Sequence, residues 1–310
     1  MEPGGKQIRK MPRKRKWWKD FDLYLMLCPM MLLILVFSYK PLTSLIIAFK
    51  DYSPYKGIWE SDWVGLEYFY EFFNSAFAWR TIRNTVTISL SMLVFGFPAP
   101  IILALLLNEI KNVKFRKLVQ TVSYIPHFIS LVVVCSMVTS FLSPTSGIVN
   151  AILKSLGFEP IYFLSKPELF VPIYVIVNVW QTIGYNSIVY IAALTSIPDD
   201  LYEAAKVDGA NRLQQALHIT LPGLLPTIMV MLLVQLGSIL DVGYEMIILL
   251  YNPSIYETAD VINTYVYRSG ILEGRYDYAT AIGLLNSVIS FILVILANKV
   301  SKKITETSLW

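Results

Sequence analysis

The chain has 310 residues, of which 55% are hydrophobic and 15% are charged, and its formal net charge is +4. Soluble proteins have about 45–50% apolar and about 25% charged residues, so this composition excludes a soluble globular enzyme. Six uncharged stretches of 17 to 36 residues lie along the sequence, and about 20 apolar residues of helix cross a hydrocarbon core about 30 Å thick. We therefore predict an all-α membrane protein with six transmembrane helices, near 22–49, 84–108, 118–143, 168–196, 223–251 and 279–299.

The first 20 residues form a strongly basic tail. They hold eight Lys and Arg side chains, four of them consecutive from Arg13 to Lys16. Such a run can mark nucleic-acid binding, but directly before an apolar segment it favours a tail that stays in the cytoplasm. The segment also resembles a secretory signal, although bulky and charged residues, Ser38 to Pro41, stand where a cleavage site would need small ones. We predict an uncleaved first helix, with 1–20 as a basic cytoplasmic tail and 21–310 as the transmembrane domain.

Basic residues between the helices set the predicted orientation. The four segments expected inside the cell hold 17 Lys and Arg, whereas the three expected outside hold 8. The inner segments are 1–20, 109–117, 197–222 and 299–310, and the outer segments are 50–83, 144–167 and 252–278. Because cytoplasmic loops carry the excess of Lys and Arg, both termini are predicted to be cytoplasmic in a multi-pass protein of the cell membrane.

The first outer segment, 50–83, is rich in aromatic side chains from Tyr52 to Trp79. An aromatic belt at the membrane–water interface is the main expectation, and a docking face for an external partner is the alternative. The two cysteines, Cys28 and Cys135, lie inside apolar stretches. Both are predicted to be small buried hydrophobes, without a disulfide or a metal pair.

Prolines interrupt three of the expected helices. Pro98 and Pro100 lie in the second, Pro126 in the third and Pro172 in the fourth. Membrane helices tolerate them where neighbours satisfy the freed backbone groups. The pattern fits a chain that kinks around a pathway.

No motif for catalysis or nucleotide binding occurs in the sequence. Walker A, GxGxxG, HExxH and GxSxG patterns are all missing. His127 and His218 have no metal-ligand company nearby in sequence, so each is interpreted as a packed or capping histidine. We predict no enzyme activity, no metal and no cofactor, and the energy source must then be another chain or an ion gradient.

The inner segment 197–222, called the coupling loop below, is too long for a simple connector. Helices in bundles are joined by about 2–8 residues, and this segment has 26. Asp200 and Glu203 have the spacing of a capping box, and Asp208-Gly209 reads as a turn. Asn211 is expected to cap a second short helix that Leu221-Pro222 ends. The segment therefore predicts a helix–turn–helix on the cytoplasmic face.

Seven residues of the coupling loop match a known motif. Glu203-Ala204-Ala205, Gly209, Ile219, Leu221 and Pro222 resemble the EAA loop of ABC-importer permeases, which inserts into a cleft on the ATPase subunit. Where sugar permeases often carry aromatics this chain has Leu213 and Ala216. The resemblance implies an ATPase-coupling role for Glu203, Ala204, Ala205, Asp208, Gly209, Ile219, Leu221 and Pro222.

Further segments resemble oligosaccharide permeases of the carbohydrate-uptake group. They are Arg83-Asn84-Thr85, Phe95-Gly96-Phe97-Pro98-Ala99-Pro100, Leu107-Asn108-Glu109, Tyr124-Ile125-Pro126-His127-Phe128-Ile129-Ser130 and Leu250-Tyr251-Asn252-Pro253. The resemblance implies a type I ABC-importer permease that pairs with a second permease, two cytoplasmic ATPase subunits and an extracellular solute-binding protein, without nucleic acid. It also implies a carbohydrate substrate, expected to be an oligosaccharide, with uronate-containing fragments as an open alternative.

Polar residues inside the fourth and fifth expected helices are the pathway candidates. Amides and carboxylates bind sugar hydroxyls and aromatic faces cover their C–H surfaces, and buried polar groups in membranes are functional candidates. The candidates are Trp180, Gln181, Tyr185, Gln235 and Asp241. Hydrogen bonding between helices at a subunit interface is an equally open interpretation.

Two other classes of protein were weighed. An ion-coupled secondary transporter would use Asp241 and Glu245 as ion sites and needs inverted repeats, which the sequence does not display. An intramembrane enzyme would need a convergent nucleophile and base, and none is evident.

Overall fold

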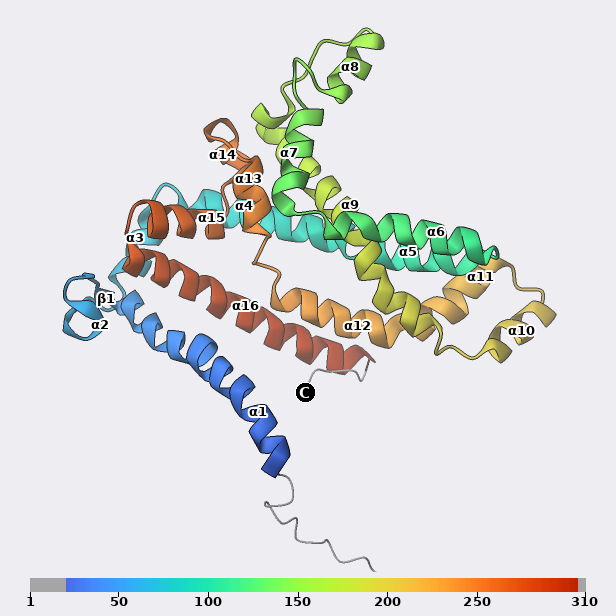
Figure 1. Cartoon of the computed structure of the whole chain (residues 1–310), viewed down its shortest axis with the longest axis horizontal. Coiled ribbons are helices and arrows are strands. Elements are labelled where there is room, and N and C mark those ends of the chain that lie inside the picture. Colours follow the sequence, from blue (N-terminus) through green and yellow to red (C-terminus); the bar gives the residue numbers. More distant parts are fainter. Residues whose placement is uncertain (1–20, 306–310) are drawn as a thin grey trace, which may run out of the picture.

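The computed structural model describes residues 21–305, and this part of the chain is almost entirely helical (Figure 1). The predicted basic tail at 1–20 lies outside the described residues. The two strands of this region form one short antiparallel pair, in which Lys50–Asp51 (β1) faces Asp62–Trp63 (β2). The predicted all-α class is confirmed.

The first expected helix is a continuous rod of 29 residues. It consists of α1 (Phe21–Ile34), a π-helical turn (η2, Leu35–Tyr39) and a 3-10 stretch (η3, Lys40–Phe49). No residue of α1 is buried, and α1 leans away from the other helices, whereas η3 packs along the last helix (Figure 1). The prediction for Cys28 was therefore wrong, because this thiol is exposed on α1, while Cys135 is buried as expected.

The segment between the first two helices carries α2 (Gly57–Glu60) and α3 (Glu67–Asn74). The buried ammonium of Lys50 donates to the carbonyls of Ile58 and Trp59 at 2.9 and 3.0 Å. Asp277 accepts a 2.7 Å hydrogen bond from the hydroxyl of Tyr68. Burial, followed by this bond and the charge of Asp277, raises the pKa of Tyr68, so its hydroxyl stays protonated and keeps this segment attached to the last helix.

The aromatic side chains of this segment divide into two groups. Tyr68 and Phe72 belong to a core cluster with Tyr265 and Tyr278. Tyr52 and Phe69 are half-buried, and the others are exposed: Tyr55, Trp59, Trp63, Tyr70, Phe73, Phe77 and Trp79. Part of the aromatic content thus builds the outer core, and the rest remains available for lipid or for a partner.

The second expected helix is confirmed over 32 residues. It runs through α4 (Ala78–Ser91), a π-helical turn (η4, Met92–Gly96) and α5 (Pro98–Glu109). The Phe97 N–H reaches the Met92 carbonyl at 2.9 Å. The π-helical turn takes up the irregularity that two prolines without N–H groups impose on the following turn.

The third expected helix is not a single rod. It is divided into α6 (Val113–Tyr124), a 3-10 turn (η5, Ile125–Phe128) and α7 (Leu131–Phe141), with a bend of 98°. Asn112 caps α6 by accepting from the Lys114 and Phe115 amides at 3.0 and 3.2 Å. Pro126 is the local cause of the bend, because it has no backbone N–H to donate a hydrogen bond within the helix.

A protrusion, in a segment predicted to lie outside the cell, separates α7 from the fourth expected helix. It contains α8 (Ile148–Ser155) and η6 (Phe163–Ser165), and the buried Asn150 amide holds it together through the backbone of Ile161. The helix that follows, α9 (Pro167–Leu194), has 28 residues and packs against α5, α6 and α12. At Gly184 a Cβ would lie 2.0 Å from the Ser123 carbonyl oxygen, so α6 and α9 touch backbone to backbone.

The fifth expected helix, 223–251, is broken. It begins as α12 (Leu221–Gly237), is interrupted at 238–243 and resumes as α13 (Tyr244–Leu250). Gly243 has φ of 33°, and a Cβ there would lie 2.8 Å from the Tyr174 hydroxyl. The expectation of a continuous helix was wrong because apolar composition continues across a segment whose backbone turns.

The segment between α13 and the last helix folds back on the bundle. Its elements are η8 (Pro253–Ile255), α14 (Tyr256–Ala259), α15 (Ile262–Tyr267) and η9 (Arg268–Leu272), followed by α16 (Tyr276–Thr305). The fully buried Asp260 accepts from Arg80 at 2.9 Å and from Arg268 at 2.8 Å. A buried carboxylate needs such partners. Arg80 fastens the fold-back to α4, whereas Arg268 ties η9 to the start of α15 within the fold-back.

Four helices of the described region are long and apolar enough to span a membrane, or five if the bent pair α6–α7 counts as one span. The fourth expected helix, α9, has the length for a span with its 28 residues, but its polar residues lower its mean hydropathy. Its position within the bundle explains why: a helix surrounded by others faces little lipid.

Candidate functional site

The coupling loop forms two short helices beyond the ends of α9 and α12 (Figure 1). The first, α10 (Asp199–Val207), follows Pro198 and has no side-chain cap. The predicted capping box of Asp200 and Glu203 was therefore wrong. Asp199 and Asp200 both lie in the first turn, where their charges favour the helix through its dipole instead.

The turn at Asp208-Gly209 is confirmed. Gly209 has φ of 79°, and no atom lies within 4 Å of the position that a Cβ would take. The Ala210 amide donates to the Ala205 carbonyl at 2.9 Å, which closes the end of α10. Glycine is required here by backbone conformation and not by crowding.

Asn211 caps the second helix as predicted. Its side chain accepts from the Gln214 amide at 2.9 Å, and the Gln214 side chain accepts from the Asn211 amide at 2.8 Å. This helix, α11 (Arg212–Gln215), passes through a π-helical turn (η7, Ala216–Thr220) directly into α12. The expected stop at Leu221-Pro222 was wrong, because the π-helical turn accommodates the proline.

Two side-chain contacts hold the coupling loop to itself and to the bundle. The Tyr202 hydroxyl lies 3.0 Å from the Thr220 hydroxyl, which joins α10 to η7. Arg212 and Glu109 form an exposed ion pair at 3.4 Å, which links α11 to the end of α5. The first contact involves a buried hydroxyl and is the firmer of the two.

Half of the predicted coupling residues gather in one hollow. Ala205, Asp208, Gly209 and Ile219 line a pocket of about 330 Å³, together with Ala210, Gln214, Gln215 and His218. Glu203 and Ala204 lie exposed on α10, and Leu221 and Pro222 start α12 outside this pocket. His218 is exposed, with Nδ1 3.0 Å from the Gln214 carbonyl oxygen, so it is not packed in a core.

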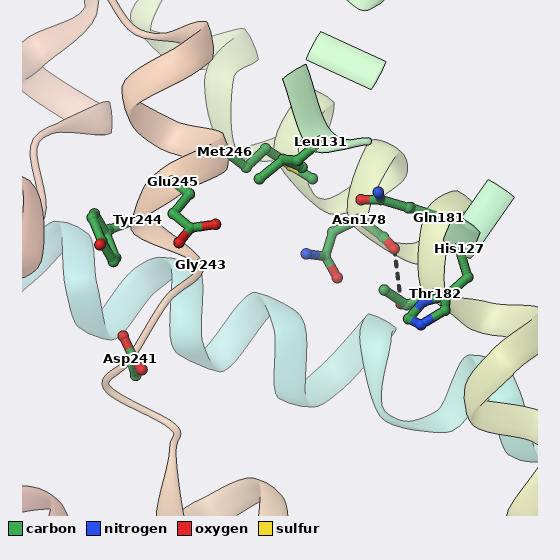
Figure 2. A pocket seen from close by; sticks show the side chains of 10 residues that line it. All are labelled: His127, Leu131, Asn178, Gln181, Thr182, Asp241, Gly243, Tyr244, Glu245 and Met246. Carbon is green, nitrogen blue, oxygen red and sulfur yellow. Dashed lines mark hydrogen bonds between the residues drawn. The ribbon is translucent and has the colours of Figure 1, made fainter. Parts of the chain in front are cut away.

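A second pocket, an open hollow of about 370 Å³, lies between α7, α9 and α13 and is called the pathway pocket below (Figure 2). It opens where two helices are interrupted, at the bend before α7 and at the break between α12 and α13. Its lining residues are His127, Leu131, Asn178, Gln181, Thr182, Asp241, Gly243, Tyr244, Glu245 and Met246.

The predicted pathway residues divide around this pocket. Gln181 and Asp241 line it. Tyr185 lies beside it, because its ring stacks on the His127 ring with centroids 3.9 Å apart and planes 7° from parallel. Trp180 and Gln235 lie outside the pocket, and both are exposed on the surface of the chain.

Asp241 is held by neighbours of the same chain. It lies in the break and not within a helix, and its Oδ1 accepts from the Asn263 amide at 2.7 Å. The Asn263 oxygen in turn accepts from Asn286 at 3.3 Å. This chain of contacts connects the break to α15 and α16, and within the described residues it engages only one of the two carboxylate oxygens of Asp241.

Sequence reasoning noted Asn178 as a polar group that should not face lipid, but it missed His127 and Thr182 as residues of the same pocket. His127 was interpreted from its sequence neighbours alone, yet the groups that surround it come from α9 and from the break after α12. Pro126 was the usable signal, because a proline inside an apolar stretch marks the point where a polar side chain can face a cavity. Glu245 was considered only as an ion site.

The chain is similar to a set of membrane transport proteins. A family model described as binding-protein-dependent transport system inner membrane component matches residues 96–306. Protein LplB of Bacillus subtilis is 42% identical, over 94% of this chain and 92% of that protein. The polygalacturonan/rhamnogalacturonan transport system permease protein YteP of Bacillus subtilis is 41% identical, over 98% of this chain and 95% of that protein.

Two solved structures are similar over nearly the whole chain. One is a bacterial ABC transporter involved in the import of the acidic polysaccharide alginate, with a TM-score of 0.87, 49% identity, and coverage of 93% of this chain and 97% of that one. The other is a bacterial alginate ABC transporter in complex with an alginate pentasaccharide-bound periplasmic protein. It has a TM-score of 0.88, 48% identity, and coverage of 94% and 98%.

Proposed function

The chain belongs to the family of binding-protein-dependent transport system inner membrane components, and on that basis we propose that it imports acidic oligosaccharides built from uronic acids. It is a permease subunit of an ABC importer and not an enzyme, and it works with a second permease, two ATPase subunits and a solute-binding protein. The observation that carries the substrate class is the similarity, at 41–49% identity, to proteins named for alginate and polygalacturonan transport.

The coupling loop is the proposed contact for the ATPase. Its two short helices are fixed by the Gly209 turn, the Asn211 cap and the Tyr202–Thr220 contact. Because η7 runs without interruption into α12, a push on the loop is transmitted along a helix that leads to the pathway pocket. Both termini and this loop lie on the cytoplasmic side in the proposal, and 21–310 acts as one permease domain.

The pathway pocket offers the chemistry that an acidic sugar needs. The amides of Asn178 and Gln181 and the ring of His127 provide hydrogen-bond donors on one wall, and Tyr185 stacked on His127 adds an aromatic surface. Asp241 and Glu245 place carboxylates on the opposite side. A uronate would therefore turn its carboxylate towards the amide wall and its hydroxyls towards the acids, because like charges repel.

The proposal is tested with the complete importer in proteoliposomes. Uptake of a galacturonate trisaccharide, an alginate trisaccharide and maltotriose is measured with the cognate binding protein and internal ATP. We expect uptake of at least one acidic trisaccharide and none of maltotriose. Uptake of maltotriose alone would contradict the substrate class.

The same vesicles test the ion-coupled alternative, which the relatives do not support. A proton or sodium gradient is imposed in place of ATP. We expect no accumulation under these conditions, and accumulation without the ATPase subunits would reject the ATP-driven mechanism.

A further inference from the structure

A groove lies between the fold-back and the last helix. It has a volume of about 510 Å³, and its walls are α15 with η9 on one side and α16 on the other, which lie side by side (Figure 1). Leu45 of η3 and Tyr244 at the start of α13 complete its lining. It is called the α15–α16 groove below, and no role described above is assigned to it.

The α15–α16 groove adjoins the pathway pocket. Tyr244 lines both hollows. Asn263 lines the groove and donates at 2.7 Å to Asp241, which lines the pathway pocket. A chain of linked sugar rings that is held at Asp241 can therefore extend past Tyr244 into the groove.

The groove also reaches the end of α16 that is predicted to lie outside the cell. Its lining on α16 begins at the first residue of this helix, Tyr276, and ends at Ser287. These eleven steps correspond to about 16 Å along a helix, at about 1.5 Å per residue. In the proposed orientation, the groove thus leads from the outer surface to the level of the pathway pocket.

The lining of the groove combines aromatic rings with neutral polar groups. Its polar members are Tyr244, Asn263, Tyr267, Tyr276, Thr280 and Ser287. The hydroxyls of Thr280 and Ser287 donate to backbone carbonyls of α16 at 2.6 and 2.9 Å, so their oxygens remain as acceptors for sugar hydroxyls. Tyrosine has an apolar ring and a polar tip, which suits the C–H face and the hydroxyl edge of a sugar.

None of the described residues that line the groove is charged. A carboxylate there would repel an acidic sugar, and a basic side chain would hold it. A pathway needs binding that permits entry and also release. A neutral polar wall meets both conditions.

Small residues keep the groove open. A Cβ at Gly270 would lie 2.8 Å from the Cβ of Ala279, so η9 and α16 approach each other closely at that point. At Gly283, by contrast, no atom lies within 4 Å of the position that a Cβ would take. The space beside Gly283 is therefore not filled by this chain.

We propose that the α15–α16 groove is a second sugar subsite, which admits the oligosaccharide from outside the cell to the pathway pocket. Sugar rings pack against its tyrosines, and their hydroxyls donate to Thr280 and Ser287. The next ring along the chain then reaches Asp241. The inference rests on the proposed function and orientation, and it adds the place where the substrate enters this subunit.

The first test asks whether water fills the groove. Cys28 and Cys135 are replaced by alanine, and S287C in the groove is compared with V288C, the next residue, which is exposed outside the groove. The complete importer in proteoliposomes is treated with a charged methanethiosulfonate reagent. V288C should react on the order of tenfold more slowly than S287C, because the reactive thiolate is disfavoured in apolar surroundings. Equal rates for the two cysteines would overturn the inference.

The second test blocks the groove. G283W places a large side chain in the open space beside Gly283, and V288W is the matched control outside the groove. Uptake of the galacturonate and alginate trisaccharides is measured with the cognate binding protein and internal ATP. G283W should lose uptake but keep the ATP hydrolysis that the loaded binding protein stimulates, and V288W should keep both.

Three results of the second test would overturn the inference. They are normal uptake by G283W, loss of uptake in both tryptophan variants, and dissociation of the second permease from G283W alone, which would assign the groove to a contact between subunits. Wild-type uptake of maltotriose in place of the acidic trisaccharides, blocked only by G283W, would contradict the proposed substrate class and leave this inference supported.

Discussion

Single side chains around the pathway pocket differ in how firmly they are placed. Tyr185 and His127 fix each other by stacking at 3.9 Å, and Asp241 is tied to Asn263 at 2.7 Å. Gln181 is buried and reaches the Ile129 carbonyl only at 3.4 Å, so its amide can be taken over by a ligand. In the proposed pathway, a side chain that can exchange its hydrogen-bond partner in this way is suited to bind a sugar hydroxyl.

The Asp241→Asn substitution tests the charge in the pocket. The new side chain still offers an oxygen to Asn263, so folding and assembly should be unchanged. Loss of the carboxylate should raise uptake of acidic relative to neutral sugars about fivefold, because like charges about 4 Å apart repel by about 1 kcal/mol even in water. The ratio of kcat/KM for an acidic and a neutral trisaccharide is the measurement.

The control for this prediction is Asn263→Leu, which removes the partner and keeps the charge. It should lower uptake of both sugars alike, since it loosens the break that contains Asp241. An equal effect of Asp241→Asn on both sugars would remove Asp241 from the pathway.

The Gly209→Val substitution tests the turn of the coupling loop. Its φ of 79° is in the left-handed region, where a residue with a Cβ is strained by about 1–2 kcal/mol. The strain should open the turn between α10 and α11, so uptake and ATPase co-purification should be lost while membrane insertion persists. Both are measured on membranes with equal amounts of the chain.

A matched control exists in the outer protrusion. Gly157 has φ of 88°, and no atom lies within 4 Å of its Cβ position either. Gly157→Val should strain the backbone equally but leave ATPase binding intact. Loss of ATPase binding in both variants would mean that strain in general, and not the coupling loop, is responsible.

At the scale of whole elements, the breaks in the helices, more than the helices themselves, form the pathway pocket. The pathway pocket exists because α7 turns by 98° and because α12 and α13 are separated. The surrounding elements are packed closely, and α6 and α9 meet backbone to backbone at Gly184. Because contacts of this kind are rigid, we expect the bundle to change its conformation at the breaks.

The Gly184→Ala substitution tests that contact. The added methyl group would lie 2.0 Å from the Ser123 carbonyl oxygen, so α6 and α9 must separate, and overpacking of this kind costs about 1–3 kcal/mol. Thermal unfolding of the purified importer should occur at a lower temperature. Gly283→Ala on α16, where nothing lies within 4 Å of the Cβ position, should leave that temperature unchanged or raise it.

For the whole molecule, the sequence predicted the helical stretches well and their interruptions poorly. Uncharged length located the first, fourth and last expected helices within a few residues, and Asn211 was correctly assigned as a cap. The break at 238–243 was missed because its residues are mostly apolar, and hydropathy does not register a turn of the backbone. The pathway pocket was predicted in part, since Gln181 and Asp241 were chosen for polarity, whereas His127 depends on neighbours that are distant along the chain.

Cysteine labelling tests the proposed orientation of the molecule. Cys28 and Cys135 are first replaced by alanine. Single cysteines in 55–62, 155–160 and 255–260 should then react with an impermeant reagent added outside intact cells, and those in 111–114 and 206–212 should react only after permeabilisation. External reaction at 206–212 would exclude an ATPase contact at the coupling loop.

The packing of the first and last helices determines when during synthesis the bundle can close. Among the described residues, α1 has no buried residue, and its continuation η3 packs along α16. The first helix can therefore enter the membrane without waiting for any later one, but its most extensive contact, that of η3 with α16, forms only after the final helix leaves the ribosome. Contacts so far apart in sequence form slowly. A chain stopped before α16 would consequently leave η3 without its partner, a defect that quality-control proteases can recognise in newly made membrane proteins.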